Sequence, residues 1–219
     1  MKKIVLLGWL VLFLPAMVFA QEKVEAPVWN VGDRWVFDQG IIEIIDADQN
    51  SYTMKFPSDK TNAWLQESGG FEKLIFEKGT LNRIYALKEN KREKYKGFRR
   101  THLNFPFSPG KKWKDIFLAT PLMGYGTGMR VLEFTEAYAV LGWEEVEVRA
   151  GKFKAIKLEC EQVVTGPPGY MAQVVGSGGK AWYWYSPEIR YFVKCQYDKL
   201  YFGAYGLKDW ELASFELKK

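Results

Sequence analysis

Histidine and cysteine are scarce in this chain, and their scarcity argues against several common kinds of active site. The 219 residues include one histidine, His102, and two cysteines, Cys160 and Cys195. Zinc sites usually take three or four protein ligands, so we expect no metal centre and no cofactor. A histidine base for nucleophilic catalysis would have to be His102, which we expect at a surface or a sheet edge.

Nucleotide and hydrolase motifs are also lacking. Gly176-Ser177-Gly178 does not complete a nucleophile elbow, because position 175 is Val. Gly179-Lys180 lacks both the earlier glycine and the following Ser or Thr of a phosphate-binding loop. Glu145 and Glu147 could serve as a glycosidase pair, but alternating Glu and Val is typical of a solvated strand face. We therefore expect a protein that is not an enzyme.

Long hydrophobic runs are missing except near the N-terminus. Lys2 and Lys3 precede a mostly apolar stretch from Ile4 to Leu14, and Val18-Phe19-Ala20 places small residues where signal peptidase requires them. This pattern predicts a bacterial signal peptide over residues 1–20, with cleavage after Ala20. The mature protein would then be periplasmic or secreted.

Two alternatives to a cleaved signal fit the sequence less well. The apolar stretch is shorter than the roughly 20 residues that a membrane-spanning helix needs, and Pro15 interrupts it. A lipoprotein would have Cys after the cleavage point, where Gln21 stands. Loss of Lys2 and Lys3 lowers the formal net charge from +5 to +3. Near-balanced charge and export together argue against a nucleic-acid partner. Cleavage that leaves Gln21 at the new terminus predicts a mature protein that is not integral to a membrane.

The remaining sequence is rich in aromatic residues and shows strand periodicity. Aromatic residues make up 16% of the chain. Between Phe153 and Val164, Ile156, Leu158 and Cys160 alternate with charged residues, as in a half-buried strand. We expect an all-β or nearly all-β fold, with ten to twelve strands in a strongly curved antiparallel sheet or open barrel. At most two short helices are expected, over 59–68 and 114–124.

The domain organisation is expected to be simple. A leader over residues 21–30 precedes a single β-rich domain over residues 31–219. A tryptophan follows a glycine by three positions in Gly32-Asp33-Arg34-Trp35 and in Gly110-Lys111-Lys112-Trp113, which predicts a recurring way of starting a strand. Glycine-rich loops near residues 166 and 176 are expected to flank a mobile flap.

The two cysteines have two interpretations. Cys160 shares its strand parity with Leu158, and Cys195 shares its parity with Val193, so both thiols should face apolar surroundings. A disulfide would form in an oxidising compartment if the two strands were neighbours. Otherwise Cys160 and Cys195 are two separate buried thiols.

A basic segment spans residues 88–100. Its candidate contact residues are Lys91, Arg92, Lys94, Lys96, Arg99 and Arg100. Such a patch could bind an anionic surface, such as lipid head groups or acidic glycans, or a protein of the envelope. Its simplest interpretation is a solvated hairpin with ordinary surface charges.

The strand Trp182-Tyr183-Trp184-Tyr185 is aromatic on both faces. Trp182 and Trp184 should lie on one face, and Tyr183 and Tyr185 on the other. Core packing explains this pattern, and a surface that binds a hydrophobic ligand is the alternative.

Several short motifs resemble the DUF3108-like (TapB-like) family of exported bacterial proteins. They are the Gly-x-x-Trp strand starts, Val146-x-Val148-x-Ala150-Gly151-x-Phe153-x-Ala155, Trp184-Tyr185-Ser186-Pro187-Glu188-Ile189, Val193-Lys194 and Glu211-Leu212-x-Ser214. Arg149 departs from the small residue that is usual before the Ala-Gly turn. The resemblance implies a curved antiparallel sheet or open barrel, similar in outline to periplasmic lipoprotein and lipid carriers of the LolA kind. It brings no catalytic residues.

These observations favour a soluble, non-enzymatic envelope protein that binds or carries a lipid or other apolar ligand in a concave sheet. A structural or interaction protein with a packed core, whose basic segment contacts a partner, is the alternative. A small outer-membrane barrel and an unrecognised enzyme are less well supported, the former because of the charge density of residues 88–100.

Overall fold

The structure, a computed structural model, describes residues 22–56, 73–81, 83–88, 91–94, 103–119, 132–165, 178–198 and 209–219. The predicted signal peptide, the expected helix at 59–68, His102 and the flap loops before Gly178 lie outside these ranges. Within them the chain forms twelve strands: β1 (Arg34–Phe37), β2 (Gly40–Ala47), β3 (Ser51–Lys55), β4 (Lys73–Glu77), β5 (Arg83–Lys88), β6 (Lys91–Lys94), β7 (Lys112–Ala119), β8 (Leu132–Val148), β9 (Gly151–Thr165), β10 (Gly178–Ser186), β11 (Tyr191–Tyr197) and β12 (Trp210–Glu216).

All twelve strands belong to one antiparallel sheet. Their spatial order is β6-β5-β4-β3-β2-β1-β12-β11-β10-β9-β8-β7. Each half of the sheet is a meander of consecutive hairpins, and the first strand pairs with the last, with Trp35 of β1 opposite Phe215 of β12. The two meanders are therefore joined at the strands nearest the two ends of the described chain.

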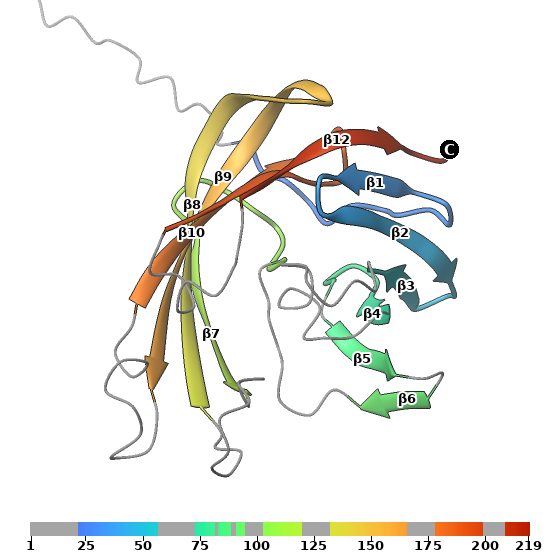
Figure 1. Cartoon of the computed structure of the whole chain (residues 1–219), viewed down its shortest axis with the longest axis horizontal. Coiled ribbons are helices and arrows are strands. Elements are labelled where there is room, and N and C mark those ends of the chain that lie inside the picture. The colour runs from blue at the N-terminus through green and yellow to red at the C-terminus, as the bar shows by residue number, and fades with distance from the viewer. Residues whose placement is uncertain are drawn as a thin grey trace, which may run out of the picture.

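The sheet is strongly curved and open, as the sequence predicts. Figure 1 shows β7–β10 on one side of the molecule and β2–β6 on the other, with β12 passing between them at the top. Strands β6 and β7 are the two edges and do not pair with each other in the described ranges. The all-β expectation is confirmed. No helix in the described part of the chain is long and apolar enough to cross a membrane.

One local expectation is wrong. Residues 114–119, part of the stretch where a short helix was expected, belong to β7, and all eight residues of this strand pair with β8. The pairing runs from Lys112 opposite Ala139 to Ala119 opposite Leu132. The strand is stabilised by pairing with β8, and this pairing cannot be detected in the periodicity of residues 114–119 alone. The helix expectation was wrong for this reason.

The period-two pattern predicted for β9 is confirmed between Ile156 and Cys160. Nearer the start of the strand the pattern changes phase, because Phe153 and Ala155, which have the opposite parity, are also buried. On β9, Ile156, Leu158 and Cys160 are completely buried, whereas Lys157 and Glu159 between them are partly exposed. The buried residues pack toward the inside of the curve, against a core that is largely aromatic. Alternation along a single strand therefore reports correctly which face meets the core.

The two Gly-x-x-Trp sequences do start strands. Gly32 has φ = 89° and Gly110 has φ = 84°, a region that side-chain-bearing residues rarely adopt. Each glycine turns the chain just before a strand, and the tryptophan that follows, Trp35 in β1 or Trp113 in β7, joins the core or packs against it.

The leader is part of the core and not a separate segment. Val24 and Phe107 exchange two backbone hydrogen bonds of 2.8 Å, so the leader pairs with the connection between β6 and β7. Trp29 is 2% exposed, and its ring meets Tyr52 and Phe76 at centroid distances of 5.5 and 5.7 Å. Residues 22–30 thus help to fill the inside of the curved sheet.

Candidate functional site

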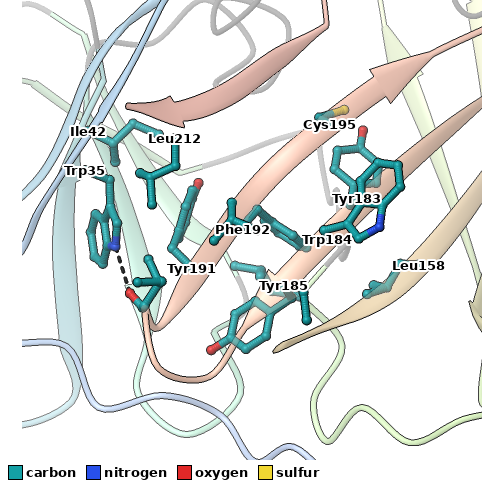
Figure 2. Close-up of a cluster of buried hydrophobic side chains, with 14 of the residues drawn as sticks. Trp35, Ile42, Leu158, Tyr183, Trp184, Tyr185, Tyr191, Phe192, Cys195 and Leu212 are labelled. Atoms are coloured by element: carbon teal, nitrogen blue, oxygen red, sulfur yellow. Dashed lines mark hydrogen bonds between the residues drawn. The ribbon is translucent and has the colours of Figure 1, made fainter. Parts of the chain in front are cut away.

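The tyrosines of the aromatic strand lie on the core face of β10. Tyr183 is 3% exposed and Tyr185 is 1% exposed. The ring of Tyr185 meets Phe105, Phe107 and Phe192 edge-on, with centroids 5.3, 5.5 and 5.6 Å apart. Figure 2 shows Tyr183, Tyr185 and Phe192 in one cluster along β10 and β11. These two tyrosines therefore pack in the core, although Tyr185 also lines a surface pocket beside the turn to β11.

The tryptophans of the same strand lie on the opposite face, among charged side chains. The Lys157 and Lys194 ammonium groups stand 4.6 and 5.2 Å from the Trp184 ring centroid, one from each neighbouring strand. The Trp184 indole N–H donates to Glu144. Cation–π contacts of this kind cover the ring, which is 4% exposed.

Glu159 organises the other end of this charged face. It accepts hydrogen bonds from Trp182 Nε1 at 2.9 Å and from Lys180 Nζ at 3.0 Å. Burial acts to raise the pKa of Glu159, but these two donors and the nearby lysine charges outweigh it and hold the pKa below its usual value. Each of the four predicted aromatic residues thus has partners within the protein.

A stack of aromatic rings lines the inner face between the two halves of the sheet. Phe105 stacks on Phe107 with centroids 4.1 Å apart, Phe107 on Trp113 at 6.1 Å, and Trp113 on Tyr138 at 5.0 Å with ring planes 6° apart. We call these four residues the aromatic stack. Phe107 is completely buried, whereas Trp113 and Phe105 are partly exposed. The connection between β6 and β7 supplies two of the rings, and β7 and β8 supply the others.

The aromatic stack ends at a group of buried polar side chains, Glu136, Tyr138 and Gln162, which we call the polar cluster. Tyr138 donates its hydroxyl to Glu136 Oε2 at 2.6 Å, and Gln162 Nε2 donates to Glu136 Oε1 at 2.9 Å. Glu136 is completely buried and Gln162 is 1% exposed. Glu136 and Gln162 lie together because the pairing of β8 with β9 places these two residues opposite each other.

One acceptor of the polar cluster has no hydrogen-bond donor in the described part of the chain. The orientation of the Gln162 amide follows from chemistry, because a carboxylate only accepts hydrogen bonds and the NH₂ group must face Glu136. Its Oε1 is then directed elsewhere and, among the described residues, receives no hydrogen bond. A buried acceptor in this state is uncommon in folded proteins and calls for an explanation.

Sequence reasoning did not find the polar cluster, although a signal was present. Glu136 shares its parity with Tyr138 and Val140, and Gln162 shares its parity with Leu158 and Cys160. A polar residue at a core-facing position of each strand is the mark of a buried polar pair. Only the register of β8 against β9 shows that the two positions are neighbours.

The cysteines are two separate buried thiols, the second of the two interpretations. Cys160 is on β9 and Cys195 on β11, and both are completely buried. Strand β10 lies between these strands, with Ala181 opposite Cys160 and Tyr183 opposite Cys195. Alternate strands are about 10 Å apart, beyond the roughly 7 Å that a disulfide allows between Cα atoms. The disulfide interpretation is therefore wrong.

The basic segment falls only partly within the described residues. Lys91, Arg92 and Lys94 belong to β6, an edge strand that pairs with β5. Lys96, Arg99 and Arg100 lie outside the described residues. A binding role for the basic segment stays a prediction.

The described residues contain no group of three or more His, Cys, Asp or Glu side chains arranged to hold a metal ion. No protein-family model matches the sequence, so the resemblance to the DUF3108-like family stays a prediction. No curated protein matches it either.

Solved structures do resemble the chain in outline. The hypothetical lipoprotein YmcC from Escherichia coli is 10% identical with a TM-score of 0.43, over 90% of each chain. An exported protein with a YmcC-like fold from Bacteroides fragilis is 12% identical, with a TM-score of 0.40 over 88% of this chain and 99% of its own. A protein from Parabacteroides distasonis described as a lipoprotein is 11% identical, with a TM-score of 0.40 over 90% of this chain and 100% of its own.

Proposed function

We propose that this chain is an exported, non-enzymatic envelope protein that binds an apolar ligand on the inner face of its curved sheet. The ligand would lie along the aromatic stack and place a hydrogen-bond donor at the polar cluster. The observation that carries this proposal is the buried Oε1 of Gln162, which has no partner among the described residues.

The chemistry of the polar cluster selects the kind of head group. An unsatisfied buried acceptor costs about 1–3 kcal/mol, which a ligand hydroxyl or amine would recover by donating to Gln162 Oε1. The Glu136 carboxylate lies beside this position, because Gln162 bonds it at 2.9 Å. A second carboxylate there would be repelled. A fatty alcohol, monoglyceride or long-chain amine therefore fits better than a fatty acid.

The aromatic stack supplies the apolar surface. Flat aromatic rings give a large contact area with little loss of side-chain freedom, and ligand pockets combine such walls with a few polar groups. Trp113 is partly exposed and stacks on Tyr138, whose hydroxyl belongs to the polar cluster. Tyr138 therefore offers a ligand an apolar ring next to a polar hydroxyl group. The predicted signal peptide adds the compartment in which lipid carriers of the LolA kind work.

Ligand uptake by the mature protein tests this proposal. Isothermal titration with monolaurin, dodecylamine and lauric acid, each below its micelle concentration, should show binding of the first two and much weaker binding of the third. Gln162→Leu should weaken binding of monolaurin by about tenfold, the value of one lost hydrogen bond of about 1.4 kcal/mol.

A matched control separates loss of the contact from loss of the fold. Gln196→Leu makes the same change at a partly buried position of β11 opposite Trp182, on the other face of the sheet. It should leave affinity unchanged, and circular dichroism should show both variants folded. Absence of binding by the folded wild type, equal binding of lauric acid, or equal affinities of the two variants would each refute the proposal.

A further inference from the structure

A pocket of about 280 Å³ lies where the leader meets the turn between β10 and β11. We call it the turn pocket. It is lined by Glu25, Pro27, Val28 and Asn30 of the leader and by Tyr185, Pro187 and Arg190 of the turn. None of these residues belongs to the aromatic stack or the polar cluster, although the Tyr185 ring contacts Phe105 and Phe107 of the aromatic stack.

Arg190 is held in an unusual conformation at the edge of the turn pocket. Its φ of 61° lies in the left-handed region, which side-chain-bearing residues avoid and which tends to occur at functional sites. Its carbonyl accepts the indole N–H of Trp29 at 2.9 Å. Its Nη1 donates to Oδ2 of the buried Asp33 at 3.3 Å. The turn and the guanidinium are therefore fixed before any ligand arrives.

Asp33 engages only one of the guanidinium nitrogens of Arg190, as far as the described residues show. Asp33 bonds one guanidinium nitrogen, and within the described residues no other hydrogen bond or ion pair involves this side chain. The side chain is 31% exposed and lines the turn pocket. Arginine keeps its charge at any physiological pH, and its planar fork suits a carboxylate.

Tyr185 provides a second donor. The residue is 1% exposed, yet it lines the turn pocket. In Figure 2 its hydroxyl oxygen is directed away from the labelled apolar side chains. Among the described residues this hydroxyl makes no hydrogen bond. Burial raises the pKa of Tyr185, so the hydroxyl keeps its proton.

We propose that the turn pocket binds a small amino carboxylate, with the carboxylate held by Arg190 and Tyr185 and the ammonium group near Glu25. Glu25 also lines the pocket, where its exposed carboxylate pairs with Lys23 at 2.8 Å. A ligand ammonium would share this carboxylate with Lys23, whereas a second ligand carboxylate meets a like charge. Pro27, Val28 and Pro187 form apolar walls for the carbon skeleton. The volume of about 280 Å³ is just below the roughly 300 Å³ at which drug-sized pockets begin, so a ligand smaller than a typical drug suits it.

Competitive binding to the full mature chain tests this inference. Titration with 5-aminovalerate, butyrate, glutarate and butylamine, followed by NMR chemical shifts, should rank 5-aminovalerate first and glutarate below butyrate. Arg190→Gln should weaken 5-aminovalerate binding by about tenfold or more, and Tyr185→Phe by a smaller factor. Arg149→Gln is the matched control, because Arg149 is an exposed arginine paired with Asp38 and Glu211. It should leave the affinity unchanged.

Arg190→Gln removes a partner of buried Asp33 and could weaken the fold, so a second variant is required. Glu25→Gln changes a carboxylate whose side chain is 69% exposed and should leave the fold intact. It should reduce the preference for 5-aminovalerate over butyrate several-fold while leaving butyrate binding unchanged or stronger. No binding of 5-aminovalerate by the folded wild type, an unchanged preference in Glu25→Gln, or unchanged affinity in both Arg190→Gln and Tyr185→Phe would overturn the proposal.

Discussion

Trp35 donates its indole N–H to the carbonyl oxygen of Ile189 at 2.8 Å, and both residues are completely buried (Figure 2). The bond joins β1, near the start of the first meander, to the turn between β10 and β11. Trp29 makes a parallel bond to the carbonyl of the next residue, Arg190. Two tryptophans of the N-terminal region thus satisfy two successive carbonyls of a turn that lies about 160 residues later in the chain.

We expect Trp35→Phe to destabilise the protein by about 1–3 kcal/mol, because it leaves the buried Ile189 carbonyl without a donor. Urea denaturation followed by circular dichroism measures the change. Trp182→Phe is the control, since its acceptor Glu159 keeps the bond from Lys180. A loss as large for Trp182→Phe as for Trp35→Phe would show that the Trp35 bond has no special role.

Asp33→Asn should lower the free energy of unfolding by roughly 2–3 kcal/mol. Asp33 is completely buried and accepts bonds from the backbone N–H of Asn30 at 2.9 Å, the backbone N–H of Lys218 at 2.7 Å and the side chain of Arg190. An amide turns one of these acceptor positions into a donor that faces another donor. Asp46→Asn, at an exposed position, should change the stability by less than about 0.5 kcal/mol. Equal effects of the two substitutions in urea denaturation would contradict this assignment.

Trp29→Ala should destabilise the fold by about 3–5 kcal/mol, as expected for a large aromatic side chain removed from a core. Val28→Ala, one residue earlier and 68% exposed, should have almost no effect. Melting temperatures of the two variants provide the comparison. If Trp29→Ala had the same melting temperature as the wild type, residues 22–30 would be a dispensable leader and not part of the core.

The stability of the wild type should fall more steeply in acid than that of Glu159→Gln. The pKa of Glu159 is lowered in the folded state by its donors and neighbouring lysines, despite the opposing effect of burial. A carboxyl with a lowered folded pKa stabilises the protein above its unfolded pKa, and this contribution disappears as the pH falls through the folded value. The two unfolding curves should therefore be furthest apart above the unfolded pKa of about 4.5, and converge as the pH falls through the lowered folded value.

Glu145→Gln is the control for this pH dependence, because Glu145 is an exposed residue of β8. Its pH profile should run parallel to that of the wild type. A constant difference in stability between wild type and Glu159→Gln across the acid range would refute the link to Glu159.

Strand parity could be predicted from the sequence because it is local. Leu158 and Cys160 face the core and Lys157 does not, and the order of residues along β9 is sufficient to show this. The starts of β1 and β7 were predictable for the same reason, since a glycine with positive φ and a tryptophan three residues later act within a few residues of each other.

The candidate sites were not predictable in this way. The polar cluster requires Glu136 to lie opposite Gln162, and the turn pocket requires the leader to reach the turn that carries Arg190. Nothing in the neighbourhood of these residues specifies such partners. The tryptophans of β10 illustrate the same point, because the lysines that cover Trp184 come from two other strands.

The order of residues was enough to predict an all-β or nearly all-β fold, the core-facing residues from Ile156 to Cys160, and the glycine turns that start β1 and β7. Three features follow only from the folded arrangement: β1 pairs with β12, β10 separates Cys160 from Cys195, and Trp29 and Phe107 are buried in the core. The physical reason is the range of the interactions. Alternation follows from the geometry of a single strand, whereas register and packing depend on the free energy of burying side chains from distant parts of the chain together.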